Sequence, residues 1–173
     1  MDSPAPPASL RLFLGLWPAD EMRAALQARS DAWQWPAGAR RTQAQRLHVT
    51  LHFLGEVAAD RLPALRALDV RWDGCELVLD QAQVWPGGIA VLEASQVPPA
   101  LVALHAQLGE RLVAMGLAVE TRRYRPHVTF ARKAIGARPP PDAAPLRWRT
   151  GSGYVLVQSL PGGAGYTPIQ CLG

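Results

Sequence analysis

The chain has 173 residues, 49% of them hydrophobic and 18% charged, and a formal net charge of +4. This length suits one domain or two small lobes that share a core, and the composition excludes a disordered or collagen-like chain. Cys75 and Cys171 are too few for a zinc cluster; a disulfide between them stays open, but we expect free thiols. The apolar run "LRLFLGLW" is too short to span a bilayer and follows no basic region, so we expect a soluble, cytoplasmic protein without a membrane partner.

The N-terminal part predicts strands that alternate with helices. Residues 1–9 are rich in proline, and we expect a flexible lead-in there, followed by a single domain over residues 10–173. Apolar runs predict strands, and runs of good helix formers with early acidic residues predict helices. The expected elements are a strand over 10–18, a helix over 19–33, a strand over 47–55 and a short helix over 59–68.

The C-terminal part predicts a hairpin, a long helix and further strands. The sequence "PGG" suits a turn between two apolar runs, and leucines at helical spacing between a proline pair and Gly116 predict a helix. The expected elements are strands over 75–85 and 88–94, the helix over 98–116, a strand over 126–134, a loop over 135–145, a strand or bulged pair over 146–160 and an edge strand over 166–173. This order predicts an α+β fold with an internal duplication, visible only at one repeated motif.

The repeated motif is His-Val-Thr followed by a large apolar residue, in "LHVTLHFLG" and again in "PHVTFAR". Because side chains alternate along a strand, the histidine and the threonine of each copy point to one side and the apolar residues to the other. If the two strands face each other, two imidazoles and two hydroxyls meet in one small volume. The side chains expected on the core side are Val49, Leu51, Phe53, Val128 and Phe130.

A pair of imidazoles suits displacement at phosphorus. With an ordinary pKa of about 6.5, one histidine is able to act as a neutral base while the other acts as a protonated acid. One imidazole then deprotonates the entering oxygen and the other protonates the leaving oxygen, while threonine hydroxyls hydrogen-bond the phosphoryl oxygens. This chemistry requires no metal.

Arginines surround both copies of the motif and favour an anionic ligand, although solvated surface arginines also explain them. They precede the copies at Arg40, Arg41 and Arg46 and at Arg122, Arg123 and Arg125. Arg132 follows the second copy, and strict alternation places it on the core side, where an unpaired guanidinium is costly. A bulge or the end of the strand would turn Arg132 toward a phosphate, so we keep it as a phosphate-binding candidate.

The other two histidines are interpreted as structural. His52 shares the face of His48 by alternation, so it either lines the groove or is a polar residue at the end of the strand. His105 lies on the polar side of the predicted helix over 98–116, and we expect it at the surface.

The two motifs, the opening "RLFLGLWP" and the closing "YTP" resemble the two-histidine phosphoesterases, in particular the bacterial and archaeal RNA 2′,3′-cyclic phosphodiesterases, also called 2′-5′ RNA ligases. The resemblance extends from about Leu10 to Pro168. It implies two similar α+β lobes whose antiparallel sheets form a central V-shaped cleft, with helices on the outer faces. The family's catalytic positions carry over as two pairs, His48 with Thr50 and His127 with Thr129.

The resemblance implies hydrolysis of a 2′,3′-cyclic phosphate at an RNA end to a 2′-phosphomonoester, with no cofactor and no metal. We assign His48 as the proton donor to the leaving 3′-oxygen and His127 as the proton acceptor from water, with Thr50, Thr129 and Arg132 binding the phosphate. The reverse reaction would join a 5′-hydroxyl to the cyclic end through a 2′-5′ linkage.

The expected partners are RNA ends or nucleotides that carry a 2′,3′-cyclic phosphate, bound by a monomer. Arg46 and Arg125 are candidate RNA contacts. Tyr124 and Trp17 are candidate base-stacking residues and RNA contacts, although a packing role is the stronger explanation for both. Two alternatives stay open: a phosphodiesterase of another cyclic nucleotide or of a 2′-5′ oligonucleotide, and a non-catalytic RNA-binding module.

Overall fold

The computed structural model describes residue 5 and residues 8–173, so most of the predicted lead-in over 1–9 lies outside the described residues. Its main sheet has eight strands in the order β10-β9-β1-β3-β7-β6-β5, with the short β2 paired to β7. These strands are β1 (Ser9–Leu16), β2 (Arg40–Arg41), β3 (Val49–Ala58), β5 (Gln81–Trp85), β6 (Ile89–Glu93), β7 (His127–Arg132), β9 (Tyr154–Ser159) and β10 (Tyr166–Leu172). A second sheet pairs β4 (Glu76–Leu79) with β8 (Leu146–Arg149).

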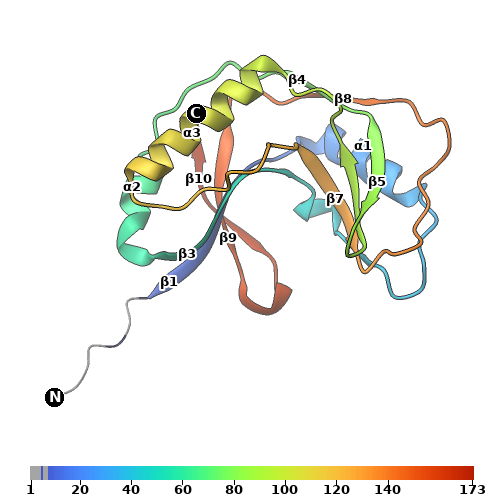
Figure 1. Ribbon diagram of the computed structural model, residues 1–173, viewed down its shortest axis with the longest axis horizontal. Coiled ribbons are helices and arrows are strands. Elements are labelled where there is room, and N and C mark those ends of the chain that lie inside the picture. The colour runs from blue at the N-terminus through green and yellow to red at the C-terminus, as the bar shows by residue number, and fades with distance from the viewer. Residues whose placement is uncertain (1–4, 6–7) are drawn as a thin grey trace.

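The main sheet consists of two halves that meet at one residue pair. All of its strand pairs are antiparallel, and β1 pairs with β3 over most of its length. By contrast, β3 and β7 pair only at Val49 and Val128, so the half with β1, β3, β9 and β10 diverges there from the half with β5, β6 and β7 (Figure 1). The predicted α+β class with antiparallel sheets is confirmed. Each His-Val-Thr copy lies at the strand of its half that adjoins the other half, β3 or β7.

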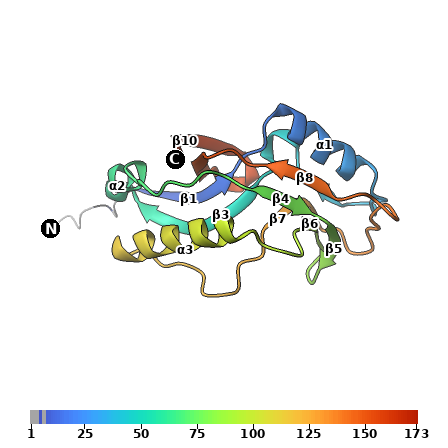
Figure 2. The same cartoon turned by 90° about the horizontal axis from the view of Figure 1, so that it is seen from above.

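Three helices and three short 3-10 turns complete the fold. They are α1 (Asp20–Asp31), α2 (Leu62–Arg66), α3 (Pro99–Ala114), η1 (Ala44–Arg46), η2 (Ala59–Arg61) and η3 (Pro161–Gly163). Figure 2 shows α3 alongside β3, and α1 near β8. No helix in the described part of the chain is long and apolar enough to cross a membrane.

Helix α3 confirms the prediction made from its leucine spacing. Its leucines face the sheet and are buried: Leu101, Leu104, Leu108 and Leu112. The helix ends where Gly116 takes a φ of 79°, and the amide of Leu117 donates to the carbonyl of Leu112 over 3.0 Å. This left-handed glycine cap satisfies carbonyls that the last helical turn leaves free.

Two predicted strands are split in the structure. The segment 75–85 forms β4 and β5 in different sheets, because the chain turns at Asp80, whose carboxylate accepts hydrogen bonds from the amide and the hydroxyl of Ser95. The segment 146–160 forms β8 and β9, also in different sheets, on either side of Gly151 with its φ of 65°. Cys75 and Cys171 are free thiols.

Bulges in β3 interrupt the strict alternation of side chains that the sequence predicts after the first motif. The register between β1 and β3 slips at Leu51 and again at Leu54, because Gly15 pairs with Thr50, Leu14 with His52 and Phe13 with Phe53. Phe53 therefore lies on the face of Thr50 with 53% of its surface exposed, so the prediction of a core position was wrong. The other residues predicted for the core side, Val49, Leu51, Val128 and Phe130, are all buried.

Candidate active site

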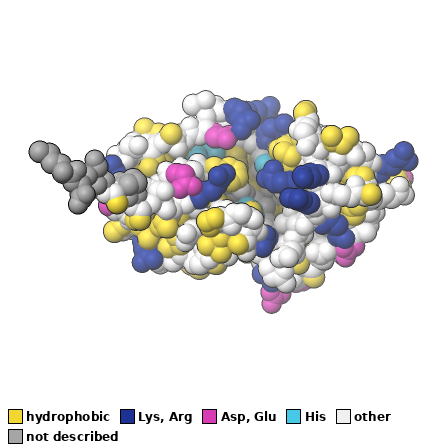
Figure 3. Space-filling view, turned by 90° about the horizontal axis from the view of Figure 1, so that it is seen from below, with side chains coloured by type: hydrophobic (Ala, Val, Ile, Leu, Met, Phe, Trp, Pro, Cys, Tyr) yellow, Lys and Arg dark blue, Asp and Glu magenta, His cyan; other side chains and the backbone are white. Residues whose placement is uncertain are grey.

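The two His-Val-Thr copies lie side by side on one face of the sheet. Val49 pairs with Val128 in antiparallel register, and both side chains are fully buried on the other face. Because side chains alternate along a strand, the neighbours of this pair, His48 and Thr50 in one copy and His127 and Thr129 in the other, lie on the opposite, open face. Figure 3 shows histidine side chains in a hollow at the middle of this face, with Lys and Arg side chains at its rim. The structure therefore brings the four predicted catalytic and phosphate-binding residues together.

His48 and His127, the two candidate catalytic histidines, are oriented by the same kind of hydrogen bond. Nδ1 of His48 bonds to the backbone carbonyl of Arg46 over 2.7 Å, and Nδ1 of His127 bonds to the carbonyl of Arg125 over 2.6 Å. A carbonyl only accepts, so each Nδ1 carries a hydrogen and each Nε2 is left for chemistry. Nε2 of His48 lies 3.0 Å from Oγ1 of Thr50. The repeated unit is thus Arg-x-His-Val-Thr, in which the arginine backbone fixes the imidazole.

A tryptophan covers each imidazole. Trp17 stacks on His48 with ring centroids 4.6 Å apart and an interplanar angle of 3°, and the edge of Tyr166 completes the enclosure at 5.4 Å. Trp85 contacts His127 with centroids 4.4 Å apart and a tilt of 59°. Trp17 therefore packs against His48, which is the packing role that the sequence analysis gave as the alternative to base stacking. Sequence reasoning missed Trp85, because its contact with His127 depends on the order of β5, β6 and β7 in the sheet, which spacing along the chain does not give.

Burial lowers the pKa of both histidines. Desolvation lowers the pKa of His48 to about 4; the bond to the Arg46 carbonyl opposes this shift and the positive charge of His127 adds to it. Desolvation also lowers the pKa of His127, against the effects of the Arg125 carbonyl and of Glu93. Both imidazoles are therefore mainly neutral near pH 7 in the free protein. The order of proton donor and proton acceptor assigned from the sequence stays a prediction.

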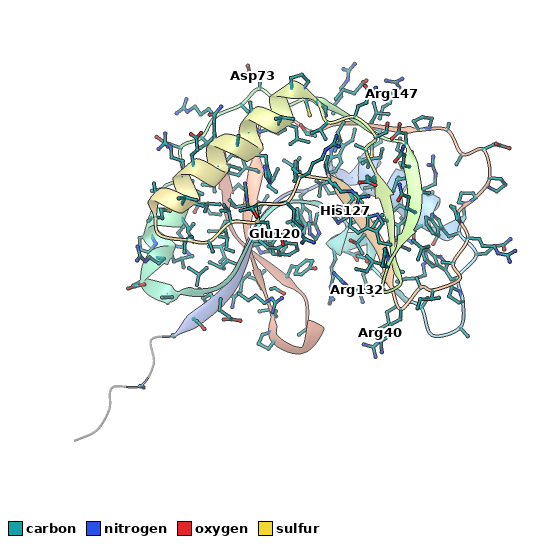
Figure 4. All side chains as sticks on the ribbon, viewed as in Figure 1. Arg40, Asp73, Glu120, His127, Arg132 and Arg147 are labelled. Atoms are coloured by element: carbon teal, nitrogen blue, oxygen red, sulfur yellow. The ribbon has the colours of Figure 1, made fainter. Side chains whose placement is uncertain are left out.

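A bulge brings Arg132 to the open side of the sheet. The β6–β7 register slips at Phe130, because Val91 pairs with Thr129 and Ala90 pairs with Ala131. Arg132 is exposed on the side of Thr129, and its charge lowers the pKa of His127. Figure 4 shows His127 and Arg132 at the two ends of β7. This is the placement that a phosphate-binding role requires, and the role itself stays a prediction.

The two arginines predicted to contact RNA lie at the hollow but already have partners. Arg125 holds Glu93 through two contacts, of 2.6 Å and 2.9 Å, and its guanidinium lies 4.5 Å from the ring centre of Trp85. Its side chain is still 51% exposed. Arg46 donates to the carbonyl of Gly163 over 3.0 Å. Both guanidinium groups are thus held in place by the protein itself.

Tyr124 supports the site from behind. Its hydroxyl donates to the backbone carbonyl of Thr50 over 2.9 Å, and desolvation by burial raises its pKa. Its ring stacks on His105, and His105 stacks in turn on His52, with centroids 4.0 Å apart in both pairs. One face of Tyr124 is therefore covered, which favours a packing role over base stacking.

This stack corrects the interpretation of His105. His105 was expected at the surface, but it is half-buried between His52 and Tyr124. The cause is the close approach of α3 to β3: a Cβ on Gly109 would lie 3.4 Å from Cε1 of His52, and Nε2 of His52 donates to the carbonyl of His105 over 2.8 Å. Because of the bulge at Leu51, His52 lies on the helix side and not in the groove.

No metal ligand set is present in residue 5 and residues 8–173: no three His, Cys, Asp or Glu side chains are grouped so as to hold an ion. The side chains gathered at the site are the imidazoles of His48 and His127, the hydroxyls of Thr50 and Thr129, and nearby arginines. These groups provide two proton carriers and several donors to phosphoryl oxygens.

The paired His-x-Thr strands match the arrangement expected of a two-histidine phosphoesterase. The family model of the 2′-5′ RNA ligase superfamily matches residues 14–150, and the chain belongs to this family. A relative from Escherichia coli (strain K12), named RNA 2′,3′-cyclic phosphodiesterase, is 37% identical over 111 residues, which cover 61% of this chain. That alignment spans 63% of the relative's length, less than two thirds of it.

Solved structures show the same fold. The crystal structure of a phosphoesterase has a TM-score of 0.80 and 29% identity, covering 95% of this chain and 97% of its own. The crystal structure of E. coli LigT complexed with 3′-AMP has a TM-score of 0.77 and 29% identity over the same shares of both chains. The likeness therefore covers both halves of the sheet.

Proposed function

We propose that this protein is an RNA 2′,3′-cyclic phosphodiesterase, which hydrolyses a cyclic phosphate end to a 2′-phosphomonoester. The observation that carries the proposal is the pairing of Val49 with Val128, which leaves the side chains next to this pair, those of His48, Thr50, His127 and Thr129, on one open face. Family membership and the name of the E. coli relative support the same reaction.

The reaction follows from the two free Nε2 atoms. One neutral imidazole takes a proton from water as the water oxygen bonds to phosphorus, and the bond from phosphorus to the 3′-oxygen breaks. The other imidazole, protonated, gives its proton to that oxygen. The hydroxyls of Thr50 and Thr129, with the guanidinium of Arg132, hydrogen-bond the phosphoryl oxygens. After one turnover the two imidazoles have exchanged protonation states, and exchange with water restores them.

The order of the two roles depends on which imidazole carries the proton when substrate binds. An anionic phosphate beside the imidazoles raises the pKa of both. We keep the assignment made from the sequence, in which His48 protonates the leaving 3′-oxygen and His127 accepts the proton from water. In ligation a 5′-hydroxyl takes the place of water as the entering group: one imidazole deprotonates it, the other protonates the leaving 3′-oxygen, and a 2′-5′ linkage forms.

The open face also suits a nucleotide. Phe53 is 53% exposed and lies on β3, the strand of Thr50. Its ring centroid is 6.0 Å from that of Phe13. An exposed aromatic ring beside a phosphate site is a stacking surface for a base. E. coli LigT, similar in fold, has been crystallised with 3′-AMP. We further infer a monomer, since one chain supplies all four site residues, and we keep the cytoplasm as the location expected from the sequence.

The test replaces each histidine by asparagine, which keeps a polar side chain of smaller size. His48→Asn and His127→Asn should each lower the rate on a 2′,3′-cyclic phosphate RNA end by about 10²–10⁴, the usual size of one acid or base contribution. Circular dichroism and thermal unfolding control for folding. His52→Asn is the matched control, because His52 lies on the helix side of the same strand. Wild-type rates in both folded site variants would refute the proposal.

Two other functions remain distinguishable. If another cyclic nucleotide or a 2′-5′ oligonucleotide is the substrate, it should compete with the RNA end and be turned over faster. A non-catalytic RNA-binding module would bind RNA in a salt-dependent manner and release no product.

A further inference from the structure

A polar pocket adjoins the active site on the second half of the sheet. Its volume is about 200 Å³, and its floor includes Glu93 on β6 and Gln81 on β5. Glu93 pairs with His127 in the β6–β7 register, and Gln81 pairs with Glu93 in the β5–β6 register. Paired residues share a face, and neighbouring strands are ~5 Å apart. The pocket therefore begins one strand beyond His127, on the face that holds the catalytic residues.

The floor of the pocket offers unused hydrogen-bonding groups. Nε2 of Gln83 donates to Oε1 of Gln81 over 3.1 Å, which fixes the two amides against each other. Nε2 of Gln81 and Oε1 of Gln83 make no further hydrogen bond to the residues that the structure describes. The pair thus presents a donor and an acceptor side by side, the groups that read base edges and ribose hydroxyls in single-stranded RNA.

The charge of the pocket is positive. Glu93 is 5% exposed, and its carboxylate is neutralised by the two contacts from Arg125. Arg123 also lines the pocket, is exposed, and forms no ion pair within the described part of the chain. One uncompensated guanidinium next to two amides suits a single phosphodiester with its nucleoside.

A ledge formed by Trp85 and Arg125 connects the pocket to the active site. Trp85 contacts His127 on one side, and the Arg125 guanidinium lies over the Trp85 ring while it also lines the pocket. A strand whose terminal phosphate lies at His127 would cross this ledge to reach Gln81 and Gln83. The ledge presents the aromatic ring of Trp85 and the guanidinium plane of Arg125, whose charge Glu93 balances, and such surfaces favour stacking of bases.

We propose that this pocket is a subsite for the nucleotide that precedes the cyclic phosphate end of an RNA strand. The inference rests on the proposed function of the active site and names its substrate as an oligonucleotide rather than a mononucleotide. Arg123 binds the internucleotide phosphate, and Gln81 and Gln83 hydrogen-bond the base or the ribose. The protein should therefore have a higher kcat/KM for an RNA with a cyclic end than for the cyclic mononucleotide of the same terminal base.

The experiment compares adenosine 2′,3′-cyclic phosphate with a tetranucleotide RNA that ends in the same group. Arg123→Ala removes one charge-assisted contact and should lower kcat/KM on the tetranucleotide about tenfold, and the double variant Q81A/Q83A should lower it as well. Neither should change the rate on the mononucleotide. Arg122→Ala is the matched control, because Arg122 is the neighbouring arginine and pairs with Glu120 outside the pocket.

The preference for the tetranucleotide over the mononucleotide should also depend on the salt concentration. The advantage of the tetranucleotide in wild type should shrink as salt rises, and Arg123→Ala should reduce this dependence. Equal kcat/KM values for the two substrates in wild type, or equal losses on both in Arg123→Ala, would overturn the subsite while leaving the phosphodiesterase intact. Failure of wild type to hydrolyse either substrate would instead overturn the proposed function and the subsite with it.

Discussion

Trp17 lies flat on the imidazole of His48, with ring centroids 4.6 Å apart and an interplanar angle of 3°. This contact removes water from one face of the imidazole, and desolvation is the main reason that the pKa of His48 falls to about 4. Replacing Trp17 by Ala should raise the pKa of His48 toward its ordinary value near 6.5. NMR titration of the imidazole protons measures this directly, and a pKa for His48 that stays near 4 in the variant would show that Trp17 is not the cause.

The pH–rate profile should reflect the same burial. The base must be neutral, so kcat/KM falls on the acid side as that imidazole is protonated. Since the pKa values of both His48 and His127 are lowered, the acid limb should lie below pH 6.5. Rates on a cyclic mononucleotide between pH 4 and 9 test this. An acid limb above pH 7 would contradict the lowered values.

Stability should decline in acid for a related reason. The pKa of His105 is lowered to about 4, chiefly by desolvation, and His52 is shifted in the same direction. The unfolded chain therefore binds protons first as the pH drops below about 6.5, so the free energy of unfolding decreases progressively as the pH falls toward 4. Urea unfolding should show a lower midpoint at pH 5 than at pH 7.5. An equal or higher midpoint at pH 5 would argue against a buried, neutral stack.

Tyr124 is a positioning residue for Thr50. Beyond Val49, β3 has no partner on the β7 side, and the Tyr124 hydroxyl satisfies the Thr50 carbonyl there. Tyr124→Phe keeps the ring stack on His105 but removes this hydrogen bond. We expect kcat to fall about three- to tenfold with little change in KM, because the lost bond is worth about 1 kcal/mol. A matching fall for Tyr154→Phe, whose hydroxyl bonds to the Val70 carbonyl away from the site, would indicate a general structural effect.

Arg132 and Arg40 offer a matched pair for the phosphate role. They are paired residues on neighbouring strands and both are exposed, but only Arg132 is placed to influence the pKa of His127. Arg132→Ala should lower kcat/KM by about 10–100-fold through loss of charge-assisted hydrogen bonds to phosphate. Arg40→Ala should have an effect of less than about twofold. Equal effects would mean that Arg132 contributes only to the general positive charge of the rim.

The sequence predicts the catalytic centre well because alternation along a strand is a local property. His48 and Thr50 share a face, as do His127 and Thr129, since no bulge lies within either tripeptide. The long helix was equally predictable, because its leucines and its terminal glycine are read from spacing alone.

Beyond the tripeptides, alternation fails because bulges depend on the partner strand. The slip at Leu51 moves His52 to the helix side and Phe53 to the open face. A similar slip at Phe130 frees Arg132. The contact of Trp17 with His48 depends on the β1–β3 register, in which Leu16 pairs with Val49, and the contact of Trp85 with His127 depends on the order of strands in the sheet. Spacing along the chain gives neither.

The most direct measurement is the identity of the product. The purified protein is incubated, in the presence of a chelator, with a short RNA that ends in a 2′,3′-cyclic phosphate, and chromatography identifies the position of the phosphate. The account predicts a 2′-phosphate in wild type and none in a His48→Asn, His127→Asn double variant. A 3′-phosphate, or an unchanged end with the folded wild-type protein, would contradict it.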